Sequence, residues 1–117
     1  DVVFCNHVME HVADPKQCMS ELFRVMKPGG WAIMQVPQDF SREQTYEDAS
    51  ITSPAEREKH FWQKDHVRLF AKDYPSYPES VGFQTVVFDF HQHYTNAQIA
   101  QYRLMESEIL YIFKKPN

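Results

Sequence analysis

Hydrophobic residues form two short continuous runs near the start of the chain. The runs are residues 2–5 (Val-Val-Phe-Cys) and residues 31–36 (Trp-Ala-Ile-Met-Gln-Val). Short apolar runs of this kind are typical of parallel strands that are covered on both faces. We therefore predict two buried strands, and the second should end at Pro37 because proline cannot continue a strand ladder.

The stretch between these two runs has the pattern of a helix. Asp14 is a good N-cap, and Pro15 suits the first helical position because its missing N–H is not needed there. The glycine pair at residues 29–30 ends the helix and turns the chain into the second strand. The apolar positions that repeat near helical spacing, and that we expect to be buried, are Cys18, Leu22, Phe23, Val25 and Met26.

Residues 38–60 are polar and acidic, with little periodicity apart from one helical turn at residues 54–58. A loop of this length is unusual inside a domain, so we interpret residues 38–60 as a mobile, lid-like segment. Residues 72–80 should be helical, although Pro75 and Pro78 must shorten or kink the helix.

The remaining third of the chain contains two further strand patterns. Residues 83–90 alternate as a strand does, and residues 109–113 form a last apolar run. Residues 97–105 between them are expected to be a helical or irregular excursion. The order of these elements predicts an α/β fold whose sheet is mostly parallel and ends in an antiparallel hairpin.

Composition excludes several classes of protein. The chain has 117 residues, 43% of them hydrophobic, with 12 basic and 16 acidic residues and a net charge of −4. The charges are intermixed, so we expect no nucleic-acid partner. No apolar run approaches the length of a membrane span, so we expect neither a membrane partner nor a signal peptide. Cys5 and Cys18 are expected to be reduced, which favours a cytoplasmic protein.

Three segments carry a resemblance to a known family. Residues 1–12 (DVVFCNHVMEHV) and residues 21–31 (ELFRVMKPGGW) resemble the region around the fourth and fifth strands of class I S-adenosylmethionine-dependent methyltransferases. Residues 60–68 (HFWQKDHVR) are similar to the region before the sixth strand in many bacterial members. The likeness extends over nearly the whole chain.

This resemblance implies that residues 1–117 are the C-terminal half of a Rossmann-like methyltransferase domain. The first three strands of the family, with the glycine-rich turn that takes the cofactor, have no counterpart in the sequence. We therefore expect the parent protein to transfer a methyl group from S-adenosylmethionine to a small molecule. This chain alone should bind the cofactor weakly or not at all and be inactive. The alternative is a truncated, non-catalytic remnant with a structural or oligomerising role.

The resemblance also implies a cofactor-binding segment directly after the first strand. Asn6, His7 and Val8 are expected to line the methionine end of the cofactor, mainly through main-chain atoms. Glu10 and His11 occupy the family's Glu-His pair, and we interpret them as structural residues near that site. The carboxyl ends of parallel strands are where ligands bind in such sheets.

A second group of polar residues follows at residues 60–68. We expect His60, Trp62, Gln63 and Arg68 to contact the substrate, and His66 to be a general base because imidazole titrates near neutral pH. The alternative is structural: Asp65 pairs with Arg68, and His66 caps the following helix.

Two histidine patterns in the sequence are candidates for metal binding. His7-x-x-Glu10-His11 is the inverted zinc-protease pattern, so a zinc hydrolase is a minor alternative. That motif needs a stable helix, and a β-prone run leads directly into His7 instead. His91 and His93 are expected to alternate in a strand or just past its end, and so to face the same side, but no third ligand is assigned by spacing. The sequence therefore predicts no metal site.

The first strand also predicts self-association. If the sheet of residues 1–117 lacks the strand that would lie beside residues 1–7, this strand becomes an exposed apolar edge. Such an edge can pair with another chain. We therefore expect a homo-oligomer that forms through the edge at residues 1–7, most simply a two-fold dimer.

Overall fold

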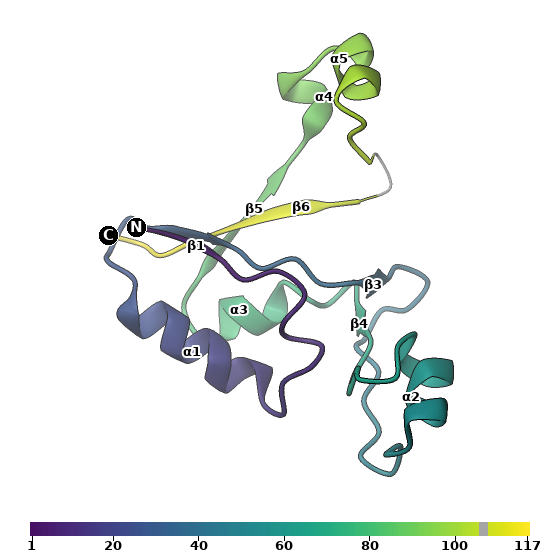
Figure 1. Cartoon of the computed structure of the whole chain (residues 1–117). Coiled ribbons are helices and arrows are strands. Elements are labelled where there is room, and N and C mark those ends of the chain that lie inside the picture. Colours follow the sequence, from purple (N-terminus) through teal and green to yellow (C-terminus); the bar gives the residue numbers. More distant parts are fainter. Residues whose placement is uncertain (106–107) are drawn as a thin grey trace.

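A four-stranded mixed sheet organises the computed structural model, which describes residues 1–105 and 108–117 (Figure 1). In spatial order the strands are β1 (Val2–Phe4), β2 (Trp31–Ile33), β6 (Leu110–Lys114) and β5 (Gln84–Phe88). β1 and β2 are parallel, whereas β6 is antiparallel to both β2 and β5. All strands of this sheet except β6 therefore run the same way. The predicted α/β fold with a C-terminal antiparallel hairpin is confirmed.

Helices α1 (Pro15–Val25) and α3 (Ser76–Ser80) lie together beneath the sheet (Figure 1). Helix α1 begins as predicted, because the side chain of Asp14 accepts a hydrogen bond of 3.0 Å from the main-chain N–H of Gln17. One predicted core position is wrong: Val25 is 60% exposed, whereas Met19 is fully buried. Met19 lies four residues after Pro15, on the face of the helix that meets the sheet.

A glycine brings α1 close to the turn between α3 and β5. Gly82 has a φ of +116°, and a Cβ atom there would lie 2.8 Å from the ring of Phe23. Helix α3 is shorter than the expected 72–80, because Pro75 occupies the N-cap and Pro78 lies in its only full turn. The rings of Phe23 and Phe83 then pack edge to face at 4.9 Å.

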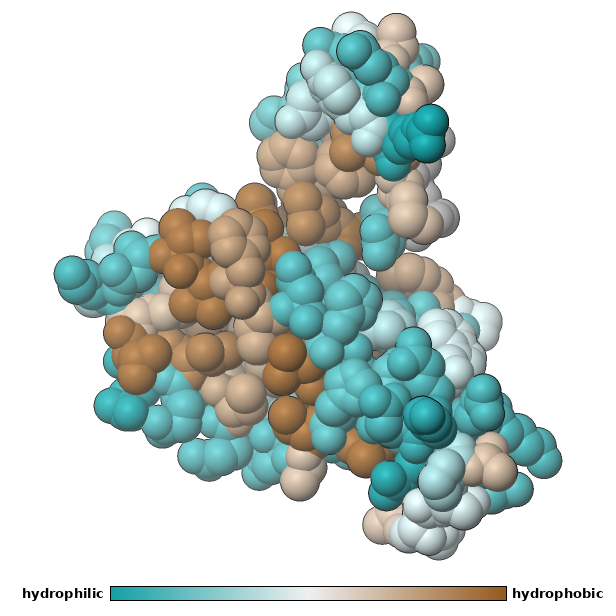
Figure 2. Space-filling model, in the orientation of Figure 1, coloured by the Kyte–Doolittle hydropathy of each residue, from teal (hydrophilic) through white to brown (hydrophobic). Residues whose placement is uncertain are grey.

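The opposite face of the sheet is apolar and solvent-exposed. Val2 and Phe4 on β1 are 48% and 67% exposed, and Val86 on β5 is 39% exposed. Figure 2 shows hydrophobic residues gathered over the region of β1 and β2. Val3 instead points inward and packs against the core. β1 is an edge strand, as predicted for residues 1–7.

Residues 38–60 contain more regular structure than the sequence analysis expected. β3 (Gln38–Asp39) pairs in parallel with β4 (Phe70–Ala71), and α2 (Pro54–Phe61) extends the single turn predicted at residues 54–58. The main chain of Tyr46 also exchanges two 2.9 Å hydrogen bonds with Leu69. The segment is therefore anchored in its middle, and its mobility as a lid stays a prediction.

The tip of the β5–β6 hairpin carries two short helices, α4 (Phe90–His93) and α5 (Asn96–Gln101), which lie apart from the rest of the molecule (Figure 1). His91 and His93 lie just past the end of the strand, one of the two placements expected, but in helix α4 and not in an extended segment. Strand β5 ends at Phe88 because Asp89 caps α4, accepting a hydrogen bond of 2.9 Å from the N–H of His91. Within residues 1–105 and 108–117, no helix is long and apolar enough to cross a bilayer.

Candidate functional site

The chain leaves β1 through a tightly held turn at the carboxyl edge of the sheet. The side-chain oxygen of Asn6 accepts a hydrogen bond of 2.9 Å from the N–H of Gln35, and the N–H of His7 donates one of 2.8 Å to the Gln35 carbonyl. His7 has a φ of 56°, a left-handed conformation that non-glycine residues seldom adopt. Strained main-chain positions of this kind gather at functional sites.

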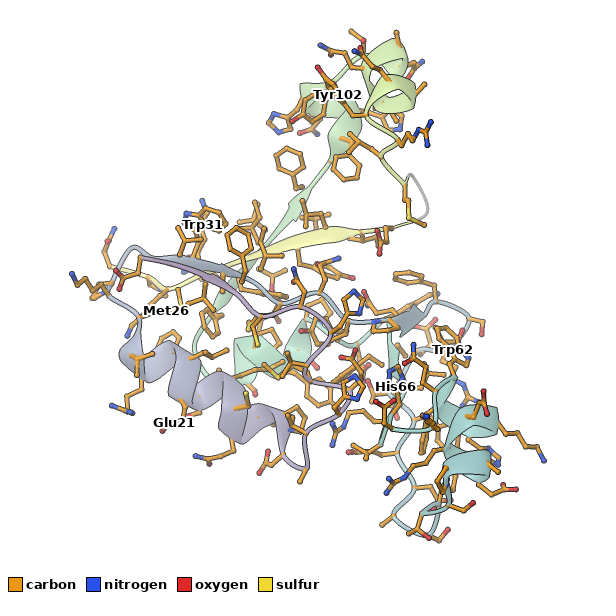
Figure 3. All side chains as sticks on the ribbon, in the orientation of Figure 1. Glu21, Met26, Trp31, Trp62, His66 and Tyr102 are labelled. Atoms are coloured by element: carbon orange, nitrogen blue, oxygen red, sulfur yellow. The ribbon has the colours of Figure 1, made fainter. Side chains whose placement is uncertain are left out.

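This turn places three histidines around one buried carboxylate; we call His7, Glu10, His11 and His66 the histidine–glutamate cluster. Glu10 is only 2% exposed, and neither carboxylate oxygen has a hydrogen-bond partner among the described residues. Its Oε1 lies 3.6 Å from Nδ1 of His7, 3.6 Å from Nε2 of His11 and 4.0 Å from Nε2 of His66. The side chain of His66 is labelled in Figure 3, between the β1 turn and α2.

Main-chain carbonyls fix the orientation of two of these rings. Nδ1 of His11 donates to the carbonyl of Asp65 at 3.1 Å, and Nδ1 of His66 donates to the carbonyl of Phe61 at 3.0 Å. A carbonyl only accepts, so each Nδ1 atom carries a proton, and the Nε2 atoms of both rings lie toward Glu10. The rings of His11 and His66 pack edge to face at 4.7 Å.

Arg68 lies under the cluster and is 1% exposed. Its guanidinium donates to the carbonyls of Met9, Val12 and Ala13 at 2.5, 2.6 and 3.1 Å, and its Nε pairs with Glu47 at 2.7 Å. The alternative in which Arg68 pairs with Asp65 is therefore wrong. Arg68 holds the loop between β1 and α1 against residues 47–68.

Two cavities flank this region. One of about 340 Å³ lies beyond the carboxyl end of β2, and Gln35, Gln38, Phe40 and Trp62 are among the residues that line it. Trp62 is half exposed, with a left-handed φ of 78° that turns the chain at the end of α2. A cavity with apolar walls and a few amide groups is typical of small-molecule sites.

The second cavity, of about 380 Å³, is lined on one side by Ala13, Val67 and Arg68 and on the other by residues 47–57. Arg68 thus forms one wall of a cavity in addition to its main-chain contacts. Its predicted contact with a substrate stays a prediction.

The predicted substrate residues do not gather in one place. Trp62 lines the 340 Å³ cavity, whereas His60 lies on α2, with Nε2 3.2 Å from Glu56 and Nδ1 3.3 Å from the Tyr46 hydroxyl. The carbonyl of Gln63 accepts a hydrogen bond of 3.2 Å from the N–H of His66. His66 does not cap a following helix, so that alternative is wrong; its ring instead joins the cluster after β1.

The structure adds functional candidates that the sequence analysis did not select. Gln35 holds both Asn6 and His7, and its side chain also bonds the main chain of Ile109 at 2.9 Å. Its one signal in the sequence is a single polar residue inside the apolar run 31–36. Glu47, the partner of Arg68, lies in a polar segment without periodicity, so the sequence pattern does not distinguish it from its neighbours.

Two groups near the cluster, the half-buried Cys5 thiol and the buried Tyr74 hydroxyl, have raised pKa values. Burial, followed by the neighbouring Cys18 and Glu10, raises the pKa of the Cys5 thiol above its ordinary value. Burial also raises the pKa of the Tyr74 hydroxyl, which donates a hydrogen bond to the carbonyl of Met34. Both groups therefore stay protonated, and neither is a nucleophile or base.

The positions of the glycines indicate whether the described residues can surround S-adenosylmethionine, because the family binds it with a glycine-rich turn. The chain has three, and Gly29 and Gly30 precede β2 while Gly82 precedes β5. All three lie at the amino ends of their strands, opposite the edge that holds Asn6 and His7. Among the described residues no glycine-rich turn lies at the carboxyl edge, so these residues do not supply that part of a cofactor cradle.

Comparisons with known proteins place the fold among those of methyltransferases. Residues 1–34, which form β1, α1 and β2, match the family model of a methyltransferase domain. Among solved structures, a proposed methyltransferase from Bacillus halodurans C-125 is 18% identical, with a TM-score of 0.53. The match covers 99% of this chain and 64% of that one. The chain has a methyltransferase fold.

Two further structures share the fold. One comes from the Haloferax volcanii complex between the Trm112 methyltransferase activator and a proposed methyltransferase. It is 15% identical with a TM-score of 0.54, and the match covers 100% of this chain and 54% of that one. The other is the (4+2)-cyclase SpnF, at 14% identity and a TM-score of 0.56, covering 99% and 50%. No curated protein matches the sequence significantly.

The resemblance to methyltransferases is thus confirmed, and the chain spans between half and 64% of the length of these methyltransferase-fold structures. Because one of the three is named as a cyclase, the fold alone does not define the reaction.

Proposed function

We propose that this chain takes part in methyl transfer from S-adenosylmethionine to a small molecule and supplies the acceptor side of the site. The observation that carries the proposal is the family match of residues 1–34, which contain β1 and β2. β1 ends shortly before Asn6–Val8, and β2 ends shortly before Gln35, which lines the 340 Å³ cavity. The sulfonium of the cofactor supplies the activated methyl group when it is bound.

In this proposal Asn6, His7 and Val8 form a wall beside the cofactor, and Gln35 holds Asn6 and His7 in place through the two hydrogen bonds described above. The 340 Å³ cavity takes the acceptor, with Trp62 covering it and amide groups of Gln35 and Gln38 orienting it. Methyl transfer depends strongly on such positioning, because the reacting atoms must lie in line.

The predicted general base, His66, is a buried residue of the cluster, 2% exposed. Its Nε2 faces Glu10 and not the 340 Å³ cavity, whose lining does not include His66. In our proposal His66 therefore acts by shaping the turn after β1. A direct proton transfer from an acceptor to His66 requires a movement of the cluster.

Photolabelling with S-adenosylmethionine that carries tritium in its methyl group tests this function on the chain itself. We expect label in the peptide that contains Asn6–Val8, and excess unlabelled S-adenosylhomocysteine should abolish it. Gln35→Ala should reduce the label because it frees Asn6 and His7, whereas Gln84→Ala on β5 should not. Absence of label at residues 6–8, or label that resists competition, would overturn the proposal.

A non-catalytic, oligomerising role is the second candidate. The observation that favours it is the exposed apolar edge at β1, where Val2 and Phe4 lie 48% and 67% exposed. We propose that a second copy of the chain covers this edge. We also propose a reducing, cytoplasmic location, because Cys5 and Cys18 are both free thiols.

A further inference from the structure

We propose that Glu10, His11 and His66 form a binding site for one divalent transition-metal ion, with Zn²⁺ as the best fit. One atom from each side chain can be chosen so that all three lie within 4.8 Å of one another. This inference goes beyond methyl transfer and depends on the cluster alone.

The first argument is the state of Glu10. Its carboxylate is 2% exposed, and neither oxygen receives a hydrogen bond from a described residue. A buried carboxylate without partners costs several kcal/mol, so such groups are paired or coordinate metals. A cation at this position would satisfy Glu10.

The second argument is the orientation of the two rings. His11 and His66 each donate their Nδ1 proton to a main-chain carbonyl, at 3.1 and 3.0 Å. Metal-bound histidines almost always make this second hydrogen bond, which leaves the other nitrogen free to bind the ion. Here both Nε2 atoms face Glu10, so two ring nitrogens and one carboxylate lie within 4.8 Å of one another.

The third argument is distance. Zn²⁺ binds nitrogen and carboxylate oxygen at about 2.0–2.2 Å, so neighbouring ligands of a tetrahedral site lie about 3.4 Å apart. The Nε2 atoms of His11 and His66 lie 3.6 and 4.0 Å from Oε1 of Glu10. These two distances exceed the ideal separation by about 0.2 and 0.6 Å. The three ligand atoms together lie within 4.8 Å of one another, so the largest approach that the geometry requires is about 1.4 Å.

The ligand set selects the class of ion. Two imidazoles and one carboxylate suit Zn²⁺ and similar first-row metals, whereas Mg²⁺ and Ca²⁺ prefer oxygen ligands. Three protein ligands leave a fourth position open. His7, whose Nδ1 lies 3.6 Å from Oε1 of Glu10 and whose side chain is 64% exposed, is the solvent-exposed member of the cluster.

The site is distinct from the helical zinc-protease motif considered from the sequence. Residues 7–11 form a turn and not a helix, so His7 and His11 do not lie one helical turn apart on a single face. The third ligand, His66, comes from the segment after α2. A bound ion would therefore tie the turn after β1 to residues 61–68.

The test measures binding of Zn²⁺ to the metal-free chain by calorimetry, with Mg²⁺ as the comparison ion. We expect one Zn²⁺ per chain and no comparable heat with Mg²⁺. Glu10→Gln and His66→Gln should each weaken Zn²⁺ binding at least about 100-fold, more than a second-sphere change typically does. His93→Gln, on α4, is the matched control and should bind as the unmodified chain does.

Glu10→Gln also separates a metal site from a buried ion pair. The side-chain amide that this substitution introduces can donate to the free Nε2 atoms, so the metal-free variant should be as stable as the unmodified chain or more so. If Glu10 is instead held by a protonated histidine, the variant should lose stability, and that result would overturn the proposal.

A measurement on the unmodified chain tests the site even if the variants fail to fold. In nitrogen-15 NMR spectra, Zn²⁺ should shift the Nε2 resonances of His11 and His66 and leave those of His93 in place. Unchanged imidazole resonances, or Zn²⁺ binding of equal strength in Glu10→Gln, would refute the site.

Discussion

The guanidinium of Arg68 donates a hydrogen bond of 2.5 Å to the main-chain carbonyl of Met9, just after β1. The same side chain bonds the carbonyls of Val12 and Ala13, so one buried cation satisfies three main-chain acceptors in the loop that leads into α1. This contact joins the strand end to the segment that carries His66. It makes Arg68 the main structural support of the site.

Arg68→Lys should therefore destabilise the chain by about 3 kcal/mol or more, because a lysine cannot reach the three carbonyls and Glu47 at once. Urea unfolding measures the loss. Arg24→Lys is the matched control: among the described residues Arg24 pairs only with the exposed Glu21, at 2.9 Å, so the change in stability should be less than about 1 kcal/mol. Equal losses in both variants would contradict the role of Arg68.

Tyr74 should make the free energy of unfolding depend on pH in the alkaline range. Burial raises the pKa of its hydroxyl, so the folded chain keeps the proton while the unfolded chain loses it near the ordinary tyrosine pKa of about 10. The contribution to stability is therefore complete below about pH 10 and is lost as pH rises above it.

The test compares unfolding of the unmodified chain and Tyr74→Phe from pH 7 to pH 11. At pH 7 the variant should be less stable by about 1–2 kcal/mol, because the carbonyl of Met34 loses its donor. Above pH 10 the difference should shrink by up to about 1.4 kcal/mol per pH unit. Tyr102→Phe, at an exposed position, should show neither effect; a constant difference for Tyr74→Phe would contradict the assignment.

The exposed edge at β1 should mediate self-association. We expect the unmodified chain to form a dimer or larger assembly in light scattering, and Phe4→Lys to shift it toward monomer, because a charge at a strand edge opposes pairing. Val25→Lys is the control, at a similarly exposed apolar position on α1. A monomeric unmodified chain, or an assembly that Phe4→Lys leaves intact, would show that β1 is not the interface.

The order of the main elements could be predicted from the sequence because local signals agreed with tertiary packing. Asp14 and Pro15 define the start of α1, and the apolar runs become β1 and β2. Helical spacing assigns Val25 to the core, yet it is exposed because α1 meets the sheet on one narrow face only. Amphipathic spacing shows that a face is buried but not how wide it is.

The site was harder to predict because its residues come from distant segments. Sequence proximity grouped His60, Trp62 and His66, but the fold sends Trp62 to the 340 Å³ cavity and His66 to Glu10. The two hydrogen bonds that Gln35 makes to Asn6 and His7 cannot be inferred from spacing, since they depend on the register between β1 and β2.

Titration of the nitrogen-15-labelled chain with S-adenosylhomocysteine, followed by NMR, tests the central claim most directly. In our proposal Asn6, His7 and Val8 form only one wall of the cofactor site. We therefore predict shifts centred on these residues and a dissociation constant weaker than about 10 μM, or about −7 kcal/mol. Unchanged signals at residues 6–8 up to millimolar ligand would contradict the assignment of this edge to the cofactor. Binding tighter than about 10 μM would contradict the claim that the chain forms an incomplete site.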